Sequence, residues 1–231
     1  MKRVLLKLSG EALAGPNKTG FDEETVLGVA RQVKSLYEEG MEIGIVIGGG
    51  NFWRGRSSKN IERTKADQIG MLATVMNCIY VSEIFRYVGM KTEIFSPFAC
   101  GSMTVLYGKD AVMEALAEKK VVFFAGGTGH PYFSTDTTTA LRAIEMEAEA
   151  ILMARAVDGV YDSDPKLNPD AKRYDEISID EVIEKRLAVM DLTASIMCME
   201  NKMPMLIFGL EGENSIVNAV KGPFTGTRIL V

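Results

Sequence analysis

Short, nearly all-apolar runs alternate with longer amphipathic stretches along this chain, and that alternation constrains the fold more than any other feature. The first unit is an apolar run at residues 4–8 and a helical pattern over residues 25–38, for which Asp22 is a suitable N-terminal cap. Later apolar runs lie at residues 42–47, 91–95, 120–125, 150–153, 205–208 and 227–231, and helical patterns at residues 66–88, 109–118, 137–147 and 214–220. Strands that are apolar on both faces are typical of sheets covered by helices on both sides. The sequence therefore predicts an α/β fold: a three-layer α/β/α sandwich with a mostly parallel central sheet.

The segment after residue 153 is more polar, and we expect shorter elements in it. Residues 158–170 are rich in Asp, Gly, Asn and Pro, which indicates a loop or a hairpin. Ser178 and Glu181 match a capping box for a helix to about residue 186, and Asp191 is a candidate cap for a helix to about residue 201. No linker-like change of composition and no internal repeat interrupts the chain, so we expect one domain over residues 1–231.

Charge, cysteine and histidine content exclude several classes of function. The formal net charge is −5 and the pI is about 5.2, which argues against nucleic acid or anionic lipid as a general partner. Cys78, Cys100 and Cys198 have no paired spacing and fit a reducing compartment, so the expected location is the cytoplasm. The N-terminal apolar run is short and contains Lys7, so we expect neither a signal peptide nor a membrane span. His130 is the only histidine, which excludes a serine–histidine relay and a histidine-rich metal site.

Two glycine-rich segments follow the first two predicted strands. In an open parallel sheet, ligands bind beyond the carboxyl ends of the strands. Lys7 lies beside Ser9 and Gly10, where a glycine turn can expose backbone N–H groups to a phosphate. Residues 48–55 contain three consecutive glycines, which let the backbone approach an anion, and Arg54, which can neutralise it. These segments predict a phosphate site at one edge of the sheet.

Two further segments of this kind follow later strands. Residues 126–136 combine glycines and hydroxyl groups with the start of a helix, for which Asp136 is a candidate cap, and they suit a second phosphorylated ligand. In residues 158–165, Tyr161 can contact a nucleotide base or ribose, and Asp164 can engage ATP or its metal ion. Neither the Walker spacing nor Gly-x-Gly-x-x-Gly occurs at the glycine segments, which argues against a P-loop kinase and a dehydrogenase.

Four motifs resemble the amino-acid-kinase family, and within it the bacterial uridylate kinases, along essentially the whole chain. They are LKLSGEAL at residues 6–13, VIGGGNFWRG at 46–55, DQIGMLATVMN at 67–77 and TGHPYFSTD at 128–136, with VDGVY at 157–161 and VMDL at 189–192 as further matches. The resemblance implies the amino-acid-kinase fold and transfer of the γ-phosphoryl group of ATP to UMP. It implies ATP contacts at Lys7, Leu8, Ser9, Gly10, Gly50, Arg54, Arg155, Tyr161 and Asp164. It implies UMP contacts at Gly49, Asp67, Thr128, Gly129, His130, Pro131, Tyr132, Phe133, Ser134 and Thr135.

The resemblance also carries expectations about partners and regulation. It implies Mg²⁺ that arrives with ATP and has few protein ligands, a homohexamer, a role in pyrimidine nucleotide synthesis, and feedback inhibition by UTP. Position 156, where many relatives carry lysine, is Ala156, and Arg155 is adjacent to it. His130 stands where asparagine is common, and residues 14–21 do not match the loop associated with GTP activation in some relatives. GTP activation is therefore not among our predictions.

Catalysis should depend on positioning and charge neutralisation, because donor and acceptor are both polyanions. We expect Lys7 to contact the transferring phosphoryl group, Arg54 to neutralise phosphate, and Asp191 to hold the cations in place. Two alternatives stay open. The first is an enzyme of the same fold that phosphorylates a carboxylate or carbamate, such as acetylglutamate or aspartate, against which Asp67 and residues 128–135 speak. The second is a nucleotide-binding regulator without turnover, which the departure at Ala156 permits.

Overall fold

The computed structural model describes residues 1–231 with the exception of 54–59, 166, 188, 211 and 213. Over this part of the chain the central sheet has nine strands in the order β4-β3-β5-β2-β1-β6-β10-β11-β9. Every neighbouring pair in it is parallel except β10 with β11. The predicted α/β fold is therefore confirmed. The strands are β1 (Arg3–Leu8), β2 (Glu42–Ile47), β3 (Thr92–Ser96), β4 (Val105–Leu106), β5 (Val121–Phe124), β6 (Ala150–Arg155), β9 (Glu176–Ser178), β10 (Met205–Gly209) and β11 (Thr227–Leu230).

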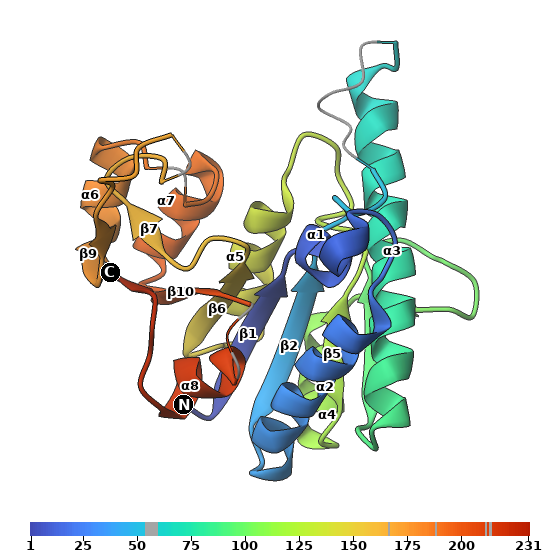
Figure 1. Cartoon of the computed structure of the whole chain (residues 1–231). Helices are drawn as coiled ribbons and strands as arrows, with labels where there is room; N and C mark the ends of the chain where they lie inside the picture. The colour runs from blue at the N-terminus through green and yellow to red at the C-terminus, as the bar shows by residue number, and fades with distance from the viewer. Residues whose placement is uncertain (54–59, 166, 188, 211, 213) are drawn as a thin grey trace.

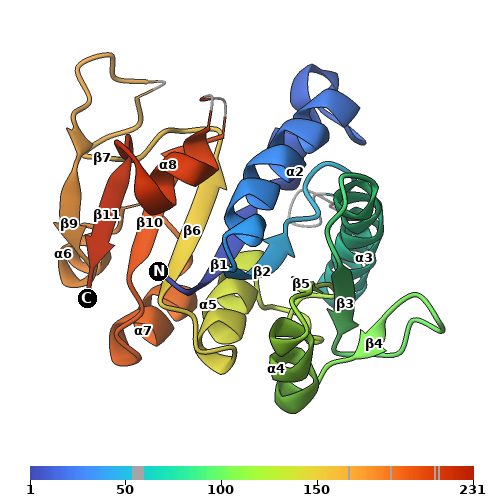
Figure 2. The ribbon, with the colours of Figure 1, turned by 90° about the horizontal axis from the view of Figure 1, so that it is seen from below.

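Helices cover both faces of this sheet (Figures 1 and 2). One face carries α2 (Glu23–Glu38), α3 (Arg63–Tyr87) and α8 (Ser215–Lys221), whose buried side chains form one apolar cluster with the sheet. The other face carries α4 (Lys109–Ala117), α5 (Thr135–Glu145), α6 (Ile179–Glu184) and α7 (Leu192–Glu200), which form the second cluster.

The alternation of side chains along β1 decides where its one cation points. Leu6 and Leu8 pack into the cluster under α2 and α3, whereas Leu5 packs into the cluster under α5. Since successive side chains of a strand point to opposite faces, Lys7 shares the face of Leu5. Lys7 thus lies at the carboxyl end of a central strand on the α5 side.

Several helices have the N-terminal capping side chains that the sequence predicted. Asp22 accepts from the N–H of Thr25 at 3.0 Å and caps α2. Ser178 caps α6 and Asp191 caps α7 in the same way, so these three expectations are confirmed. The expectation for α5 is wrong. Ser134 caps α5 by accepting from the N–H groups of Asp136 and Thr137, and Asp136 lies in the first turn with its side chain available for other contacts.

Several short elements had no counterpart in the sequence pattern. They are the helical turns α1 (Gly10–Leu13) and η1 (Gly15–Asn17) and the edge strands β4 and β9. Strands of two or three residues are too short for a period of two to show in the sequence. The polar segment after β6 forms a small antiparallel hairpin of β7 (Val160–Tyr161) and β8 (Arg173–Tyr174).

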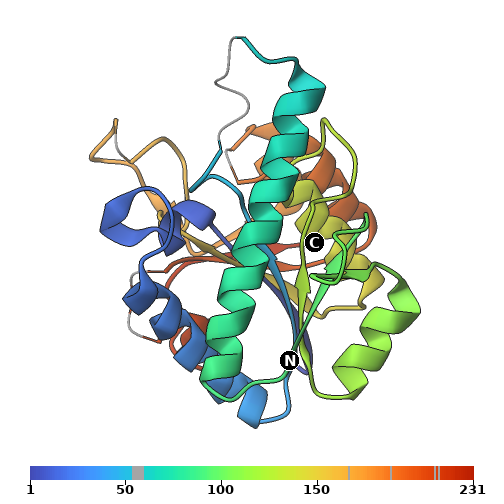
Figure 3. The ribbon, with the colours of Figure 1, turned by 90° about the vertical axis from the view of Figure 1, so that its right-hand side faces the viewer.

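The C-terminal part of helix α3 packs against one face of the sheet, and its N-terminal part extends beyond the carboxyl edge of the sheet (Figure 3). Within the described ranges it is a helix that meets the length and composition criteria for a membrane span, and 44% of its most apolar window is buried inside the protein.

Candidate functional site

Two cations from neighbouring strands meet one carboxylate at the carboxyl edge of the sheet. Lys7 Nζ lies 2.6 Å from Asp136 Oδ1, and Arg155 Nη2 lies 3.6 Å from Asp136 Oδ2. Lys7 comes from β1, Arg155 ends β6, and Asp136 lies in the first turn of α5. The side chains of Lys7 and Asp136 are only 12% and 17% exposed, so their attraction is weakly screened. The negative charge of Asp136 offsets the repulsion between Lys7 and Arg155, so the two cations can lie close together.

The first two glycine segments pack against each other beside these cations. A Cβ on Gly10 would lie 2.2 Å from the carbonyl oxygen of Gly48, so this position accepts no larger residue without a backbone shift. A Cβ on Gly50 would lie 2.9 Å from Glu11 Oε1. Leu8 is fully buried at the end of β1, and Ser9 precedes the turn into α1. The two turns therefore present backbone at the same edge, as a phosphate site requires.

A buried pair of amide side chains, which the sequence analysis missed, holds the second glycine segment. Asn51 and Asn77 exchange hydrogen bonds of 3.0 and 2.8 Å, and both are at most 2% exposed. Asn77 also donates to the carbonyl oxygen of Gly48 at 2.7 Å, and Asn51 donates to that of Gly20 at 2.8 Å. Buried amides are costly unless bonded in this way. A polar residue within the apolar pattern of a long helix was the sequence signal for Asn77.

A cavity of about 520 Å³ opens between α3, α5 and the loop before α5. Its lining contains nine of the residues that the resemblance implied: Lys7, Gly49, Gly50, Asp67, Thr128, His130, Phe133, Ser134 and Thr135. It also contains residues that the sequence analysis did not assign to a ligand, chiefly Trp53, Arg63, Asp136 and Thr138. The indole of Trp53 donates to the carbonyl oxygen of Ala66 at 2.8 Å, which fixes one wall.

The loop over residues 126–134 closes one side of this cavity. Gly126 has φ +74°, and a Cβ there would lie 2.8 Å from the ring of Phe98, so the turn needs glycine. The hydroxyl of Thr74 accepts from the N–H of Gly126 at 2.8 Å and ties the loop to α3. Tyr132 donates its N–H to Asp67 Oδ2 at 2.8 Å. Gly129, Pro131 and Tyr132 belong to this loop without lining the cavity.

The structure gives Asp191 a different set of contacts from the expected one. Its carboxylate accepts from the hydroxyl groups of Ser134 and Thr137 and from the N–H of Ala194. Burial raises the pKa of Asp191, but these hydrogen bonds outweigh burial and hold the pKa below its ordinary value. The residue that contacts the cations is Asp136, and Asp191 instead joins the start of α5 to the start of α7.

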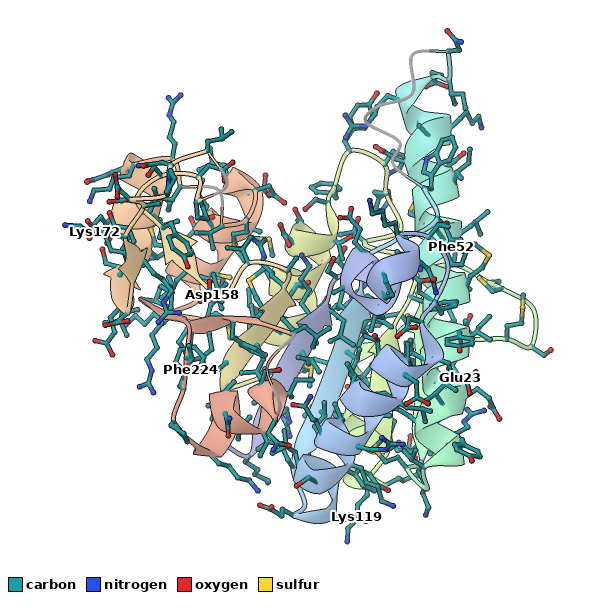
Figure 4. All side chains as sticks on the ribbon, in the orientation of Figure 1. Glu23, Phe52, Lys119, Asp158, Lys172 and Phe224 are labelled. Carbon is teal, nitrogen blue, oxygen red and sulfur yellow. The ribbon has the colours of Figure 1, made fainter. Side chains whose placement is uncertain are left out.

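Tyr161 and Asp164 lie on the hairpin side of the sheet edge and do not line the cavity. The Tyr161 hydroxyl donates to Asp158 Oδ1 at 2.7 Å, and Arg173 Nη1 lies 2.6 Å from Asp158 Oδ2. Figure 4 shows Asp158 between the region of the β7–β8 hairpin and the central sheet. The hydrogen bond from Tyr161 helps to hold the pKa of Asp158 below its usual range although burial raises it, and the same bond raises the pKa of Tyr161.

Arg54 and Ala156 are two further positions that the sequence analysis singled out. Arg54 lies outside the described residues. Ala156 lines a second, larger cavity of about 1340 Å³ between the α1–η1 segment, α2 and α8, and Arg155 and Glu11 line it as well. The structure therefore supplies a second cation near Lys7 from Arg155 although Ala156 is uncharged.

Carboxylates are sparse as metal ligands here. In the described ranges no group of three or more His, Cys, Asp or Glu side chains is arranged to hold a metal ion. Asp136 is engaged by Lys7 and Arg155, and Asp191 by hydroxyl and amide donors. These residues do not form an all-protein cage, and they suit a Mg²⁺ ion carried mainly by phosphate oxygens and water.

The fold and this site define a class: open α/β proteins that bind phosphorylated small molecules at the carboxyl edge of a parallel sheet. Residues 2–209 match the model of the amino acid kinase family. The chain belongs to that family.

Solved structures agree over the full length. The chain is similar to the UMP kinase from Bacillus anthracis, with 33% identity, a TM-score of 0.95, and coverage of 99% of this chain and 96% of that one. It is similar to the UMP kinase from Ureaplasma parvum, with 33% identity, a TM-score of 0.94, and coverage of 100% and 99%. It is also similar to the uridylate kinase from Archaeoglobus fulgidus, with 28% identity, a TM-score of 0.75, and coverage of 99% and 100%.

Proposed function

We propose that this protein is a kinase that transfers the γ-phosphoryl group of ATP to UMP, giving UDP and ADP, with residues 1–231 acting as one catalytic unit. The observation that carries the proposal is the Lys7–Asp136–Arg155 cluster, two members of which, Lys7 and Asp136, line a cavity together with two glycine segments and the start of α5. Full-length similarity to three UMP or uridylate kinases supports the choice of acceptor.

Charge neutralisation is the main task of the two cations. Lys7 and Arg155 come from adjacent strands, so both can reach the phosphate chain between donor and acceptor. Asp136 accepts a hydrogen bond from Lys7 on one oxygen and forms an ion pair with Arg155 through the other, and thereby holds both cations before a ligand arrives. Groups that are oriented in advance stabilise the transferring phosphoryl group without reorganising during the reaction. We assign Lys7 to the transferring group, Arg155 to the ATP phosphates and Asp136 to positioning.

The acceptor needs no protein base. The second pKa of a phosphate monoester is about 6, so its attacking oxygen is already ionised near neutral pH. The positive end of the α5 dipole, with Ser134 and Thr135 in the cavity lining, favours an anion at this end of the cavity. Mg²⁺ bound to ATP would neutralise further phosphate charge when present. We retain Arg54 as a further contact to the ATP phosphates, as the resemblance implies.

We also propose an oligomer, and a homohexamer in particular. Ile69, Leu72, Met76 and Ile79 recur at helical spacing on α3 and are all exposed. A contiguous apolar stripe of this kind favours contact with a second copy. Light scattering on the purified protein measures the order of the assembly, and Leu72→Lys is expected to lower it.

Feedback by UTP and a place in pyrimidine nucleotide synthesis belong to the same proposal, because UTP carries the uridine group that the acceptor cavity would hold. The free thiols of Cys78, Cys100 and Cys198 fit the cytoplasm.

The test is ADP release by the purified protein with ATP, Mg²⁺ and one acceptor at a time. UMP, CMP, acetylglutamate and carbamate separate the possible reactions. We expect release with UMP and much less with the other three. Release with acetylglutamate or carbamate alone would show a different reaction of the same fold. Binding of ATP without release of ADP with any acceptor would show a regulator, and either outcome contradicts the proposal.

A further inference from the structure

The carboxylate of Asp67 is held by two donors on one of its oxygens. Arg63 Nε lies 2.7 Å from Asp67 Oδ2, and the N–H of Tyr132 donates to the same oxygen at 2.8 Å. Among the residues that the structure describes, none donates to Oδ1. Asp67 lines the 520 Å³ cavity and its side chain is 17% exposed. One oxygen is thus anchored to the protein, and the other remains available to a ligand.

Arg63 makes a second contact that strengthens this arrangement. Its guanidinium carbon lies 5.2 Å from the centroid of the Tyr132 ring, within the range of a cation–π contact. Tyr132 has φ +74°, a left-handed conformation that is unfavourable for a residue with a side chain. The same two groups, the Asp67 carboxylate and the Arg63 guanidinium, therefore hold Tyr132 in a strained conformation at the rim of the cavity.

The planar guanidinium suits this role better than an ammonium group would. It can direct Nε at the carboxylate while its face covers an aromatic ring, whereas a lysine offers a single point charge. Arg63 and Asp67 are four residues apart on α3, so the helix itself sets their spacing. A carboxylate fixed in this way loses little rotational freedom when a hydroxyl group donates to its second oxygen.

We propose that Arg63 is a positioning residue for the acceptor and that, together with the backbone of Tyr132, it orients Asp67 to read a ribose hydroxyl group. The ligand class is a ribonucleoside monophosphate in preference to a deoxyribonucleoside monophosphate. This inference rests on the proposed function, because that function places the acceptor in this cavity. It adds the residue that orients Asp67, which the choice of UMP alone does not identify.

The experiment compares binding of UMP with that of its 2′-deoxy and 3′-deoxy analogues by titration calorimetry, so that the result does not depend on turnover. The natural protein should bind UMP about tenfold more tightly than at least one analogue, as a hydrogen bond to a charged group allows. Arg63→Gln should weaken UMP binding by about tenfold and bring the three ligands to within about threefold of each other. Arg63→Lys should recover little of the preference.

The matched control is Arg86→Gln on the same helix. Arg86 bonds to Thr92 and lies outside the cavity lining, so its replacement should leave the preference unchanged. Thermal unfolding of each variant checks that it folds. A folded Arg63→Gln protein with the full preference for UMP would overturn the inference, and so would a natural protein that binds all three ligands equally. Binding of UMP with the expected preference but without ADP release would contradict the proposed function and leave the role of Arg63 supported.

Discussion

The acceptor cavity and the β7–β8 hairpin are built differently, although both are expected to bind part of a nucleotide. The cavity is assembled from β1, β2, α3 and α5, and bonds between distant residues such as Lys7 with Asp136 and Asp67 with Tyr132 define its shape. The hairpin is a two-stranded ribbon in which Tyr161 and Arg173 contact Asp158 within one short segment. A single side chain of β11, the hydroxyl of Thr227, links both of its strands to the central sheet.

This difference separates two tasks. Phosphoryl transfer requires charges fixed to within fractions of an ångström, which a packed sheet edge supplies. Holding the remote end of a donor requires only a surface of suitable shape. We therefore expect changes in the cavity region to reduce turnover strongly, and changes in the hairpin to act mainly on the KM for ATP.

The largest effect is expected for Lys7→Met. Loss of the ammonium group should reduce kcat about 10²–10³-fold with little change in UMP affinity, because the charge acts on the transferring group. Steady-state kinetics and calorimetry measure the two quantities. Lys109→Met is the matched control, since Lys109 pairs with Glu147 away from the site. Near-normal turnover of a folded Lys7→Met protein would contradict both the role of Lys7 in phosphoryl transfer and the expectation that changes in the cavity reduce turnover most.

The second effect distinguishes the two aspartates. Asp136→Asn should lower kcat about 10²-fold, because it weakens the hold on both Lys7 and Arg155. Asp191→Asn should reduce kcat less, because Asp191 contacts hydroxyl and amide donors and neither cation. Kinetics of the two variants at saturating ATP and UMP provide the test. A greater loss with Asp191→Asn would restore the role first expected for that residue.

The third effect concerns the cation at the end of β6. Arg155→Ala should raise the KM for ATP and lower kcat, each by about tenfold, because a charged contact to phosphate is lost. The double variant Arg155→Ala with Ala156→Lys should regain part of the loss if a cation at either position reaches the donor. Arg228→Ala, on strand β11 and outside the cavity lining, is the control. No loss in the single variant would show that Lys7 suffices.

The hairpin should give a smaller effect. Tyr161→Phe keeps the ring and removes the bond to Asp158, so we expect the KM for ATP to rise about threefold and the KM for UMP to stay the same. Asp158→Asn should act similarly, and the two changes together should be less than additive because they remove one interaction. A change confined to the KM for UMP would place the hairpin on the acceptor side.

The smallest effect is on stability in acid. The pKa of Asp191 is lowered in the folded protein, so its contribution to stability is present above the ordinary carboxyl pKa of about 3.9 and is lost as the pH falls through the folded value. Asp191→Asn should therefore lower the Tm at pH 6 more than at pH 3. Calorimetric scans at both values test this, and an equal change at the two values would exclude a contribution from the charge.

Much of the fold could be predicted because its signals are local. The strand from residue 42 to 47 and the caps at Asp22, Ser178 and Asp191 depend on neighbours within a few residues, and the structure contains all of them. The short strands β4 and β9 and the turn α1 escaped prediction because so few residues carry no periodic signal.

The candidate site also has features that local sequence signals predict and features that they do not. The sequence by itself determined which segments meet at the carboxyl edge, since glycine-rich turns after parallel strands lead there whatever the details of packing. Only the tertiary structure decided that Asp136 holds Lys7, which lies 129 residues away, that Ser134 takes over the cap, and that Arg63 anchors Asp67 opposite Tyr132. The physical reason is that a hydrogen bond between distant segments depends on register and helix placement, which arise when the whole chain packs.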